Sequence, residues 1–152
     1  MDRWKLPKGE PLRDYPVYLS LALQWGDHDN FGHVNNTRHF LWFESARITY
    51  LEEAGLGYMM TGKSIGPILA KVDCSYRLQL KYPDVVQIGA SVTKLGRKSM
   101  VMEHAVYSHN QNAIVASGAS VIVMYDYPSQ ESIHIPDEVR ETITTLQEKV
   151  GS

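Results

Sequence analysis

The sequence predicts an α+β domain in which one long antiparallel β-sheet wraps around a central, buried α-helix. Three observations lead to this prediction: an alternating strand pattern near the start, one strongly apolar helix after it, and four successive strand patterns before a last helix. A single antiparallel sheet around the first helix satisfies this order. One helix covers only one face of such a sheet and leaves edges to be paired, so we expect a homodimer or homotetramer.

The first strand pattern runs from Val17 to Trp25, where apolar residues recur with a period of two. From Asn36 to Ala54 the period becomes helical, and apolar residues occupy much of the helix circumference. We therefore expect a largely buried helix. Asn35 or Asn36 is suited to cap its start, and Gly55 is suited to its end.

The rest of the chain is rich in strand patterns separated by turn residues. We expect strands over residues 65–80, with a kink near Pro67, and over residues 86–92, 100–109 and 113–125. A last helix opens at Pro136 and has one apolar stripe. We divide the chain into an extended lead-in, residues 1–16, and a single domain, residues 17–152, that ends with this helix.

Length, charge and cysteine content restrict the classes of function. The 152 residues suffice for one domain with a sizeable core. A net charge of -2 argues against general binding to nucleic acid or to membrane surfaces. Cys74, as the single cysteine, excludes an internal disulfide framework. Without a membrane-spanning apolar run or a signal-peptide core, we expect a cytoplasmic protein, with a mitochondrial location left open.

The polar stretch between the first strand and the helix, Trp25 to His39, carries the chemistry. It holds two carboxylates and three histidines beside the first turn of a helix. A helix N-terminus offers free N–H groups and a positive dipole end that can polarise a carbonyl. A neighbouring carboxylate can then attack that carbonyl or activate water against it.

Metal sites in this stretch are not expected. The spacing of His28, His33 and His39 is not that of a zinc helix motif, and no cysteine assists them. A calcium loop fails because Phe31 stands at a ligand position and Arg38 stands where the bidentate glutamate belongs.

The run from Gly26 to Asn36 reads Gly-Asp-x-Asp-x-x-Gly-His-Val-Asn-Asn. Together with the predicted sheet and helix, it resembles the hotdog-fold acyl-CoA thioesterases of the 4-hydroxybenzoyl-CoA thioesterase type. Residues 43–47 and 83–86 also resemble segments of that family, and the resemblance extends over about residues 17–125. It implies hydrolysis of acyl-CoA to free acid and coenzyme A, with no metal or organic cofactor besides the coenzyme A of the substrate.

The resemblance also implies roles for the loop residues. Asp29 matches the family's catalytic aspartate, as nucleophile or as general base, although Asp29 could instead only cap the turn. Asp27 is then expected to hydrogen-bond the loop backbone and to hold Asp29 in place. His33 either orients water, or acts as a base, or satisfies buried backbone groups. The remaining residues of the expected site match the turn and the helix start, whose amides polarise the thioester carbonyl: Gly32, Val34, Asn35 and Asn36.

Two groups of charged residues further along the chain have two interpretations each. Lys94, Arg97 and Lys98 flank a predicted hairpin, where they either bind the phosphates of coenzyme A or form a solvated hairpin tip. Glu44 is either a second carboxylate that faces substrate or the partner of Arg47 in an ion pair across one helical turn. We expect the ion pair.

The acyl group is expected to be an apolar chain of medium or greater length. Phe40 and Phe43 on the helix would bound an apolar pocket. Trp42, Met59 and Met60 line either this pocket or the core, and core packing is the default for all three. Two other functions remain open: hydrolysis of acyl groups on acyl-carrier protein, and a non-catalytic acyl-CoA binding domain. The intact Asp29 argues against the binding domain.

Overall fold

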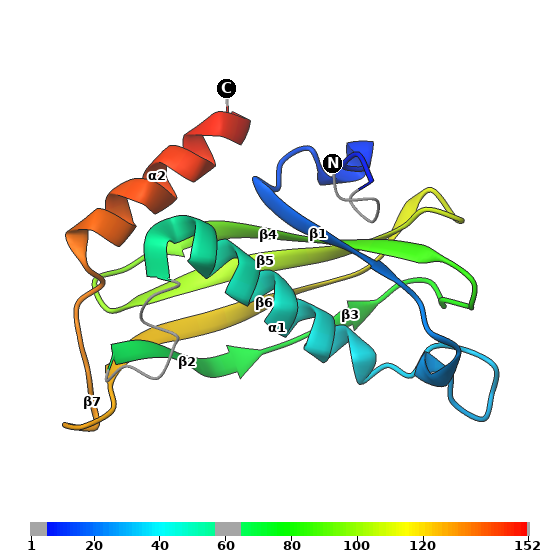
Figure 1. Ribbon diagram of the computed structural model, residues 1–152, viewed down its shortest axis with the longest axis horizontal. Coiled ribbons are helices and arrows are strands. Elements are labelled where there is room, and N and C mark those ends of the chain that lie inside the picture. The colour runs from blue at the N-terminus through cyan, green and yellow to red at the C-terminus, as the bar shows by residue number, and fades with distance from the viewer. Residues whose placement is uncertain (1–5, 57–64, 152) are drawn as a thin grey trace.

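The computed structural model describes residues 6–56 and 65–151 of the chain (Figure 1). Its strands are β1 (Val17–Ala22), β2 (Ile65–Val72), β3 (Ser75–Tyr76), β4 (Val85–Leu95), β5 (Ser99–Ser108), β6 (Ala113–Asp126) and β7 (Glu131–Ser132). Its helical elements are η1 (Glu10–Leu12), η2 (Trp25–Asp27), α1 (Arg38–Leu51), η3 (Glu52–Leu56) and α2 (Asp137–Gly151).

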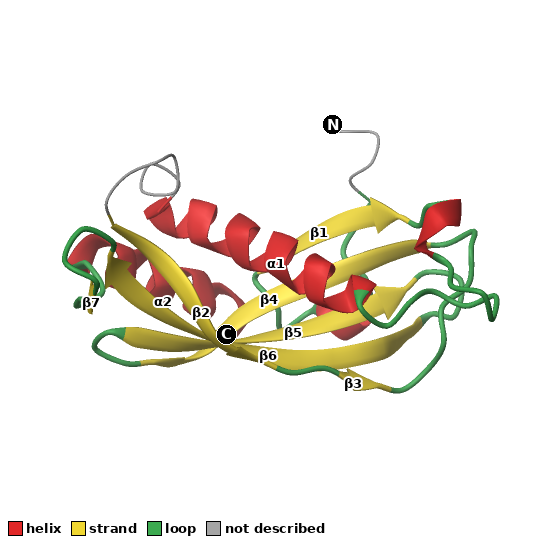
Figure 2. Cartoon of the chain, turned by 90° about the horizontal axis from the view of Figure 1, so that it is seen from below, coloured by secondary structure: helices red, strands yellow, loops and turns green. Residues whose placement is uncertain are grey.

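The described strands form one antiparallel sheet in the order β1-β4-β5-β6-β2, and β3 and β7 also pair with β6. Helix α1 lies along one face of this sheet, which curves around it (Figure 2). The predicted α+β architecture, a long antiparallel sheet around a central helix, is therefore confirmed. None of the described helices has the length and apolar character needed to cross a lipid bilayer.

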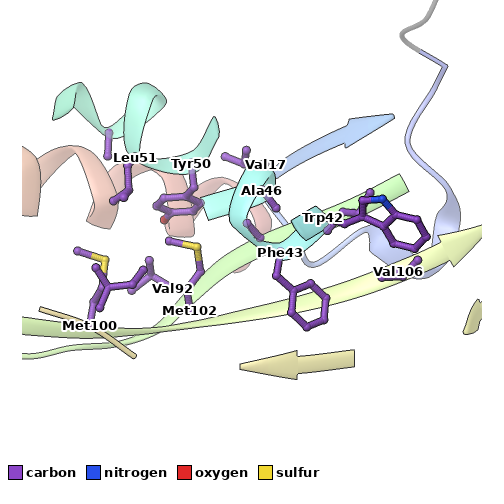
Figure 3. Packing of buried hydrophobic residues seen from close by; sticks show 14 of the residues in the cluster. Val17, Trp42, Phe43, Ala46, Tyr50, Leu51, Val92, Met100, Met102 and Val106 are labelled. Carbon is purple, nitrogen blue, oxygen red and sulfur yellow. The ribbon is translucent and has the colours of Figure 1, made fainter. Parts of the chain in front are cut away.

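The main core fills the space between α1 and the sheet (Figure 3). From the helix, Phe43, Ala46 and Tyr50 are fully buried. They face apolar residues of the central strands, among them Met102 on β5. Burying a large apolar side chain contributes about 1.5–3 kcal/mol, so this layer fixes the position of α1 on the sheet.

Helix α2 completes the edge of the sheet that β1 leaves open. Strand β1 pairs with β4 only from Val85 to Ala90. Beyond that point the side chain of Gln147 on α2 takes over, because its Oε1 accepts the N–H of Val92 at 2.9 Å. The same oxygen accepts the hydroxyl of Tyr50 at 2.6 Å, and Nε2 donates to Ser91 Oγ at 2.9 Å. One glutamine thus ties α2 to both α1 and β4.

The predicted single strand over residues 65–80 is wrong. The structure has two strands there, β2 and the two-residue β3, and the register shifts between Leu69 and Lys71 rather than at Pro67. The ladder ends after Tyr76, because the N–H groups of both Arg77 and Leu78 donate to the same carbonyl, that of Val115. Residues 77–80 are therefore a loop.

The first strand is also shorter than predicted, since it ends at Ala22 rather than at Trp25. The Asp27 carboxylate accepts the N–H of Gln24 at 2.8 Å, and the N–H of Asp27 donates to the Gln24 carbonyl at 2.9 Å. These reciprocal bonds turn the chain out of the sheet, and the Trp25 side chain is 72% exposed. The polar loop therefore begins after Ala22, three residues earlier than the alternating apolar pattern predicts.

The helix start differs slightly from prediction and its end agrees with it. Helix α1 begins at Arg38, so Thr37 holds the cap position and Asn35 lies outside the helix. Asn35 still serves the turn, since its Oδ1 accepts the N–H of Thr37 at 2.9 Å. At the other end, Gly55 in η3 has a φ of 92°, which glycine adopts without strain. Met59 and Met60 lie outside the described residues.

Candidate active site at the start of helix α1

The loop between β1 and α1 is a small hairpin of its own. Its main-chain bonds run from Asp29 N–H to the His33 carbonyl and from Asn35 N–H to the Asp27 carbonyl, both at 2.9 Å. They bring His28 opposite Val34 in an isolated antiparallel bridge. Asp29 stands where this hairpin turns back toward the helix.

The carboxylate of Asp29 is exposed and only partly used by the protein. Its Oδ1 accepts the N–H of Phe31 at 2.9 Å, and its carbonyl accepts the N–H of Gly32 at 3.3 Å. Gly32 has a φ of 81°, the left-handed region that glycine tolerates best. The described residues offer no hydrogen bond to the second carboxylate oxygen, Oδ2. Asp29 thus caps its turn with one oxygen and leaves the other for chemistry.

Asp27 fixes the base of the loop, as expected. Besides its bonds to Gln24, its Oδ1 lies 3.4 Å from Nε of Arg38 in the first turn of α1. The Asp27 side chain is 18% exposed and that of Arg38 is 40% exposed. This ion pair joins the base of the loop to the helix, so Asp27 has a structural part here.

The helix start leaves one amide unpaired. Val34 N–H donates to the Leu80 carbonyl, Asn35 N–H to the Asp27 carbonyl, and Thr37 N–H to the Asn35 side chain. The next three amides, of residues 38–40, donate to carbonyls three residues earlier. The N–H of Asn36 has no partner in the parts of the chain that the structure describes. The backbone amides of Val34, Asn35 and Asn36 were expected to polarise a carbonyl, and among the described residues only that of Asn36 is free to do so.

A cleft of about 430 Å³ brings these groups together. Asp29, His33, Val34 and Asn36 line one side of it. The loop after β3, residues 77–80, forms the opposite side with Tyr76. The cleft lies at the end of the sheet where α1 begins, near the lower right of Figure 1.

His39 forms part of the same cleft and was not predicted as a site residue. Its side chain is 3% exposed and lies against the rings of Trp42 and Tyr76, each 4.8 Å away between centroids. Neither ring nitrogen has a hydrogen-bond partner within the described structure. Burial lowers the pKa of His39 to about 4, so the ring is uncharged at neutral pH.

Tyr76 and Arg77 are two further residues that the sequence did not indicate. The Tyr76 hydroxyl donates to the Asn36 carbonyl at 2.8 Å and so holds the helix start against β3. Burial raises the pKa of Tyr76 to about 12, which keeps this donor protonated. Arg77 is exposed and lines the cleft, while its Nη2 donates to Ser117 Oγ on β6 at 3.4 Å. Both were concealed by the prediction of one continuous strand over residues 65–80.

A profile of the thioesterase-like superfamily matches residues 23–143. The chain belongs to the thioesterase-like superfamily. This membership confirms the resemblance based on the Gly26 to Asn36 motif and, with the structure, the predicted hotdog fold.

The chain is similar to known proteins over most of its length. FadM of Escherichia coli strain K12, a long-chain acyl-CoA thioesterase, is 25% identical over 118 residues, which are 78% of this chain and 89% of FadM. PA5185 from Pseudomonas aeruginosa strain PAO1 is 29% identical with a TM-score of 0.80, over 90% of this chain and 94% of that chain. A Thermus thermophilus thioesterase, solved with coenzyme A and Zn, is 27% identical with a TM-score of 0.78, over 89% of this chain and 96% of that chain.

The hairpin cations lie at the other end of the thioesterase. Lys94, Arg97 and Lys98 are exposed where β4 turns into β5. Strand β4 begins beside the cleft and is eleven residues long, so its two ends are about 33 Å apart. Within one chain these cations are not part of the Asp29 cleft. In the described ranges, 6–56 and 65–151, no group of three or more His, Cys, Asp or Glu could hold a metal ion.

Two expectations about helix side chains are wrong. Glu44 and Arg47 form no ion pair within 4 Å; Arg47 instead donates from Nη1 to Ser120 Oγ on β6 at 3.0 Å. Phe43 is buried in the core rather than exposed to the cleft, while Phe40 is 37% exposed. Trp42 is buried in the core, which is the default expected for it. The helix face that the sequence assigned to a pocket therefore packs mostly in the protein's own core.

Proposed function

We propose that this thioesterase hydrolyses acyl-CoA thioesters to free acid and coenzyme A in the cleft at the start of α1. The observation that carries the proposal is the pairing of two unsatisfied groups in one cleft. Asp29 has a free carboxylate oxygen, and Asn36 has a free amide at a helix N-terminus. FadM and the coenzyme A complex from Thermus thermophilus support the choice of an acyl-CoA substrate.

In this proposal the thioester carbonyl oxygen accepts the N–H of Asn36, which the dipole of α1 makes a stronger donor. The Asn36 side chain adds a polar group beside it. Asp29 then acts in one of two ways. Its oxygen attacks the carbonyl carbon, which expels coenzyme A thiolate and forms a mixed anhydride that water later opens. Alternatively, Asp29 removes a proton from water as the water oxygen attacks the same carbon.

Gly32, Val34, Asn35 and His33 support this arrangement. The His33 carbonyl accepts the N–H of Asp29, and the half-buried His33 lines the same cleft as Asp29. In our proposal this ring orients the attacking water. Gly32 allows the turn, and Val34 and Asn35 fix the helix start by donating their amides to backbone carbonyls.

Arg77 lines the cleft and is exposed, and we propose that its guanidinium, which donates to Ser117 Oγ at 3.4 Å in this structure, turns to bind the phosphates of coenzyme A. The guanidinium can donate two parallel hydrogen bonds to a phosphate. Lys94, Arg97 and Lys98 can reach a coenzyme A phosphate only in the site of another protomer. We keep them as a proposal that depends on the assembly.

We also propose that the protein assembles as a homodimer or homotetramer through the β2–β3 edge. This edge carries three exposed apolar side chains, Leu69, Tyr76 and Leu78, with exposed fractions of 42%, 40% and 46%. At the opposite edge β1 is the outermost described strand, and α2 covers the part of β4 that β1 does not reach. Because Tyr76 and Leu78 also line the cleft, pairing here would place each cleft at the subunit boundary.

The test is a hydrolysis panel with release of free thiol as the measurement. Acetyl-, hexanoyl-, decanoyl-, palmitoyl- and benzoyl-CoA are compared with decanoyl-acyl-carrier protein under one condition. We expect kcat/KM to rise from acetyl-CoA toward the longer acyl-CoAs, since each buried methylene adds about 0.8 kcal/mol of binding. No thiol release from any acyl-CoA, or a clear preference for the carrier-protein substrate, would overturn the proposed function.

A further inference from the structure

A second cavity lies on the side of α1 that faces β2. It holds about 210 Å³ between helix α1 and the strands β2 and β6. Most of its lining is apolar, and one charged group, Arg47, is buried in it: the lining residues are Glu44, Arg47, Ile48, Leu51, Pro67, Leu69 and Ile122. Neither the catalytic proposal nor the core packing uses this cavity.

Arg47 is a buried cation that forms no ion pair within 4 Å with any described carboxylate. The residue is 7% exposed, and its one hydrogen bond within the described chain goes to Ser120 Oγ. No described carboxylate lies within 4 Å of the guanidinium, and residues 57–64, which follow the helix, contain no Asp or Glu. Glu44 is exposed at the rim of the cavity. A buried charge left unpaired is costly, so an anion that reached Arg47 would be stabilised strongly.

The neighbours of Arg47 position it but do not neutralise it. Ser120 Oγ also lies 2.9 Å from Nε2 of His104, whose ring stacks on Phe43 at 4.8 Å. Burial, and next the charge of Arg47, lower the pKa of His104 to about 3, so this ring is uncharged. The cluster therefore supplies one positive charge, that of Arg47, and the exposed carboxylate of Glu44 at the rim of the same cavity acts on it from beyond 4 Å.

The cavity lies in line with the Asp29 cleft. Asn36, Phe40, Glu44 and Ile48 recur every four residues and share one side of the helix. That side faces β2 at the cavity and β3 with residues 77–80 at the cleft. Eleven residues separate Asn36 from Arg47, which is about 16 Å along the helix axis. Each zigzag bond of about 1.5 Å advances an extended acyl chain by only about 1.3 Å, so this distance takes roughly twelve to fourteen carbons.

We propose that Arg47 is a specificity-determining residue that binds a carboxylate at the far end of the acyl chain. This thioesterase would then prefer ω-carboxyacyl-CoA substrates of about twelve carbons over acyl-CoAs that end in a methyl group. The inference rests on the proposed function, because it assumes that the thioester carbonyl lies at Asn36. It also changes the expected substrate from a wholly apolar chain to an apolar chain with an anionic end.

The experiment compares dodecanoyl-CoA with the mono-CoA thioester of dodecanedioic acid, by thiol release. We expect the wild-type protein to have about a tenfold or greater kcat/KM for the diacid thioester, since a charge-assisted hydrogen bond is gained. The Arg47→Gln variant should lose this preference, and Arg13→Gln, which removes an exposed arginine next to η1, should keep it.

A length series on the wild-type protein keeps the inference testable if Arg47→Gln does not fold. The preference for a diacid over the matching monoacid should be absent at six carbons and present at twelve. Dodecanoyl-CoA hydrolysed as fast as, or faster than, the diacid thioester would overturn the role of Arg47 and leave the proposed function standing. Hydrolysis of neither substrate would overturn the proposed function itself.

Discussion

The two ends of α1 differ in how completely their polar groups are paired. At the end near α2, Gln147 satisfies the Tyr50 hydroxyl, the Val92 amide and the Ser91 hydroxyl. At the start of the helix, the Asn36 amide and both ring nitrogens of His39 lack partners among the described residues. Buried polar groups are normally paired, so the unpaired ring nitrogens of the buried His39 beside the free Asn36 amide indicate a place where another molecule completes the bonding.

The same contrast applies to the loops at the two ends. The β4–β5 hairpin is held by α2 and the segment before it, since Arg140 donates to the Gly96 carbonyl and Ile135 N–H donates to the Arg97 carbonyl. The Asp29 loop is held mainly by bonds within itself, and Phe31 at its tip is 85% exposed. We infer that the α2 end serves stability and the helix-start end serves catalysis, and four predictions test this division.

The largest expected effect comes from Asp29→Asn. Asparagine keeps the acceptor for the Phe31 amide and removes the carboxylate, so the loop should keep its shape. We expect kcat to fall by about 10²–10⁴-fold with little change in the unfolding free energy. Thiol release and urea unfolding measure the two quantities. Asp14→Asn, a change at an exposed aspartate outside the cleft, is the control and should retain full activity.

Gln147→Leu should show the opposite pattern. It leaves the buried Tyr50 hydroxyl and the Val92 amide unpaired, at a cost of about 1–3 kcal/mol each. We expect the unfolding free energy to fall by about 2–4 kcal/mol while kcat at 25 °C stays within about twofold. Thr144→Leu, on an exposed position of the same helix, should cost far less. A loss of kcat without a loss of stability would break the division between the two ends.

Buried neutral histidines should make the protein sensitive to acid. Burial lowers the pKa of His39 to about 4 and that of His104 to about 3, below the unfolded value of about 6.5. The unfolded state then binds more protons, so stability is full above about pH 6.5 and is lost as the pH falls toward 4. Each histidine should contribute about 1.4 kcal/mol per pH unit in that window.

Urea unfolding at pH 7 and pH 5 measures this effect. His39→Phe, which replaces the ring by an apolar one of similar shape, should reduce the loss between the two pH values by about half. His134→Phe changes an exposed histidine and should leave the loss unchanged. Identical pH dependence in the wild-type protein and His39→Phe would show that His39 is not held neutral.

The smallest expected effect concerns coenzyme A binding. Arg77→Ala should raise KM for decanoyl-CoA by about tenfold, because one guanidinium–phosphate contact is lost. It should leave KM unchanged for a short thioester without the nucleotide. The triple variant Lys94→Gln, Arg97→Gln, Lys98→Gln should leave both values unchanged if each cleft is served by its own chain. A raised KM in the triple variant would instead show that a hairpin from another protomer reaches the cleft.

The periodicity of apolar residues predicted much of the fold. The buried helix and the central strands pack against neighbouring elements along their whole length, and this packing imposes a regular apolar pattern on their sequences. The prediction failed at the β2–β3 edge, where no described strand lies on the outer side and the polar chain leaves the ladder after Tyr76. The site was located by the Gly26 to Asn36 motif. The motif did not locate the opposite wall of the site, which includes Tyr76 and Arg77. These residues lie 40 or more positions from Asn36 in the sequence.

Arg47 shows the limit of local reasoning most clearly. The three-residue spacing from Glu44 permits an ion pair on the helix surface, and sequence alone favours it. The guanidinium instead turns inward to Ser120, a residue 73 positions away. Only tertiary packing decides between these partners, and the choice leaves an unneutralised cation beside the proposed acyl path.

The most direct test of the central claim is to ask which end of α1 binds the thioester. The probe is a ketone analogue of decanoyl-CoA in which a methylene replaces the sulfur, followed by amide NMR of the labelled protein. We predict that the Asn36 N–H moves downfield on binding and that Gly96 in the β4–β5 hairpin does not move. The largest shifts at Gly96 and in α2, with Asn36 unchanged, would contradict the account.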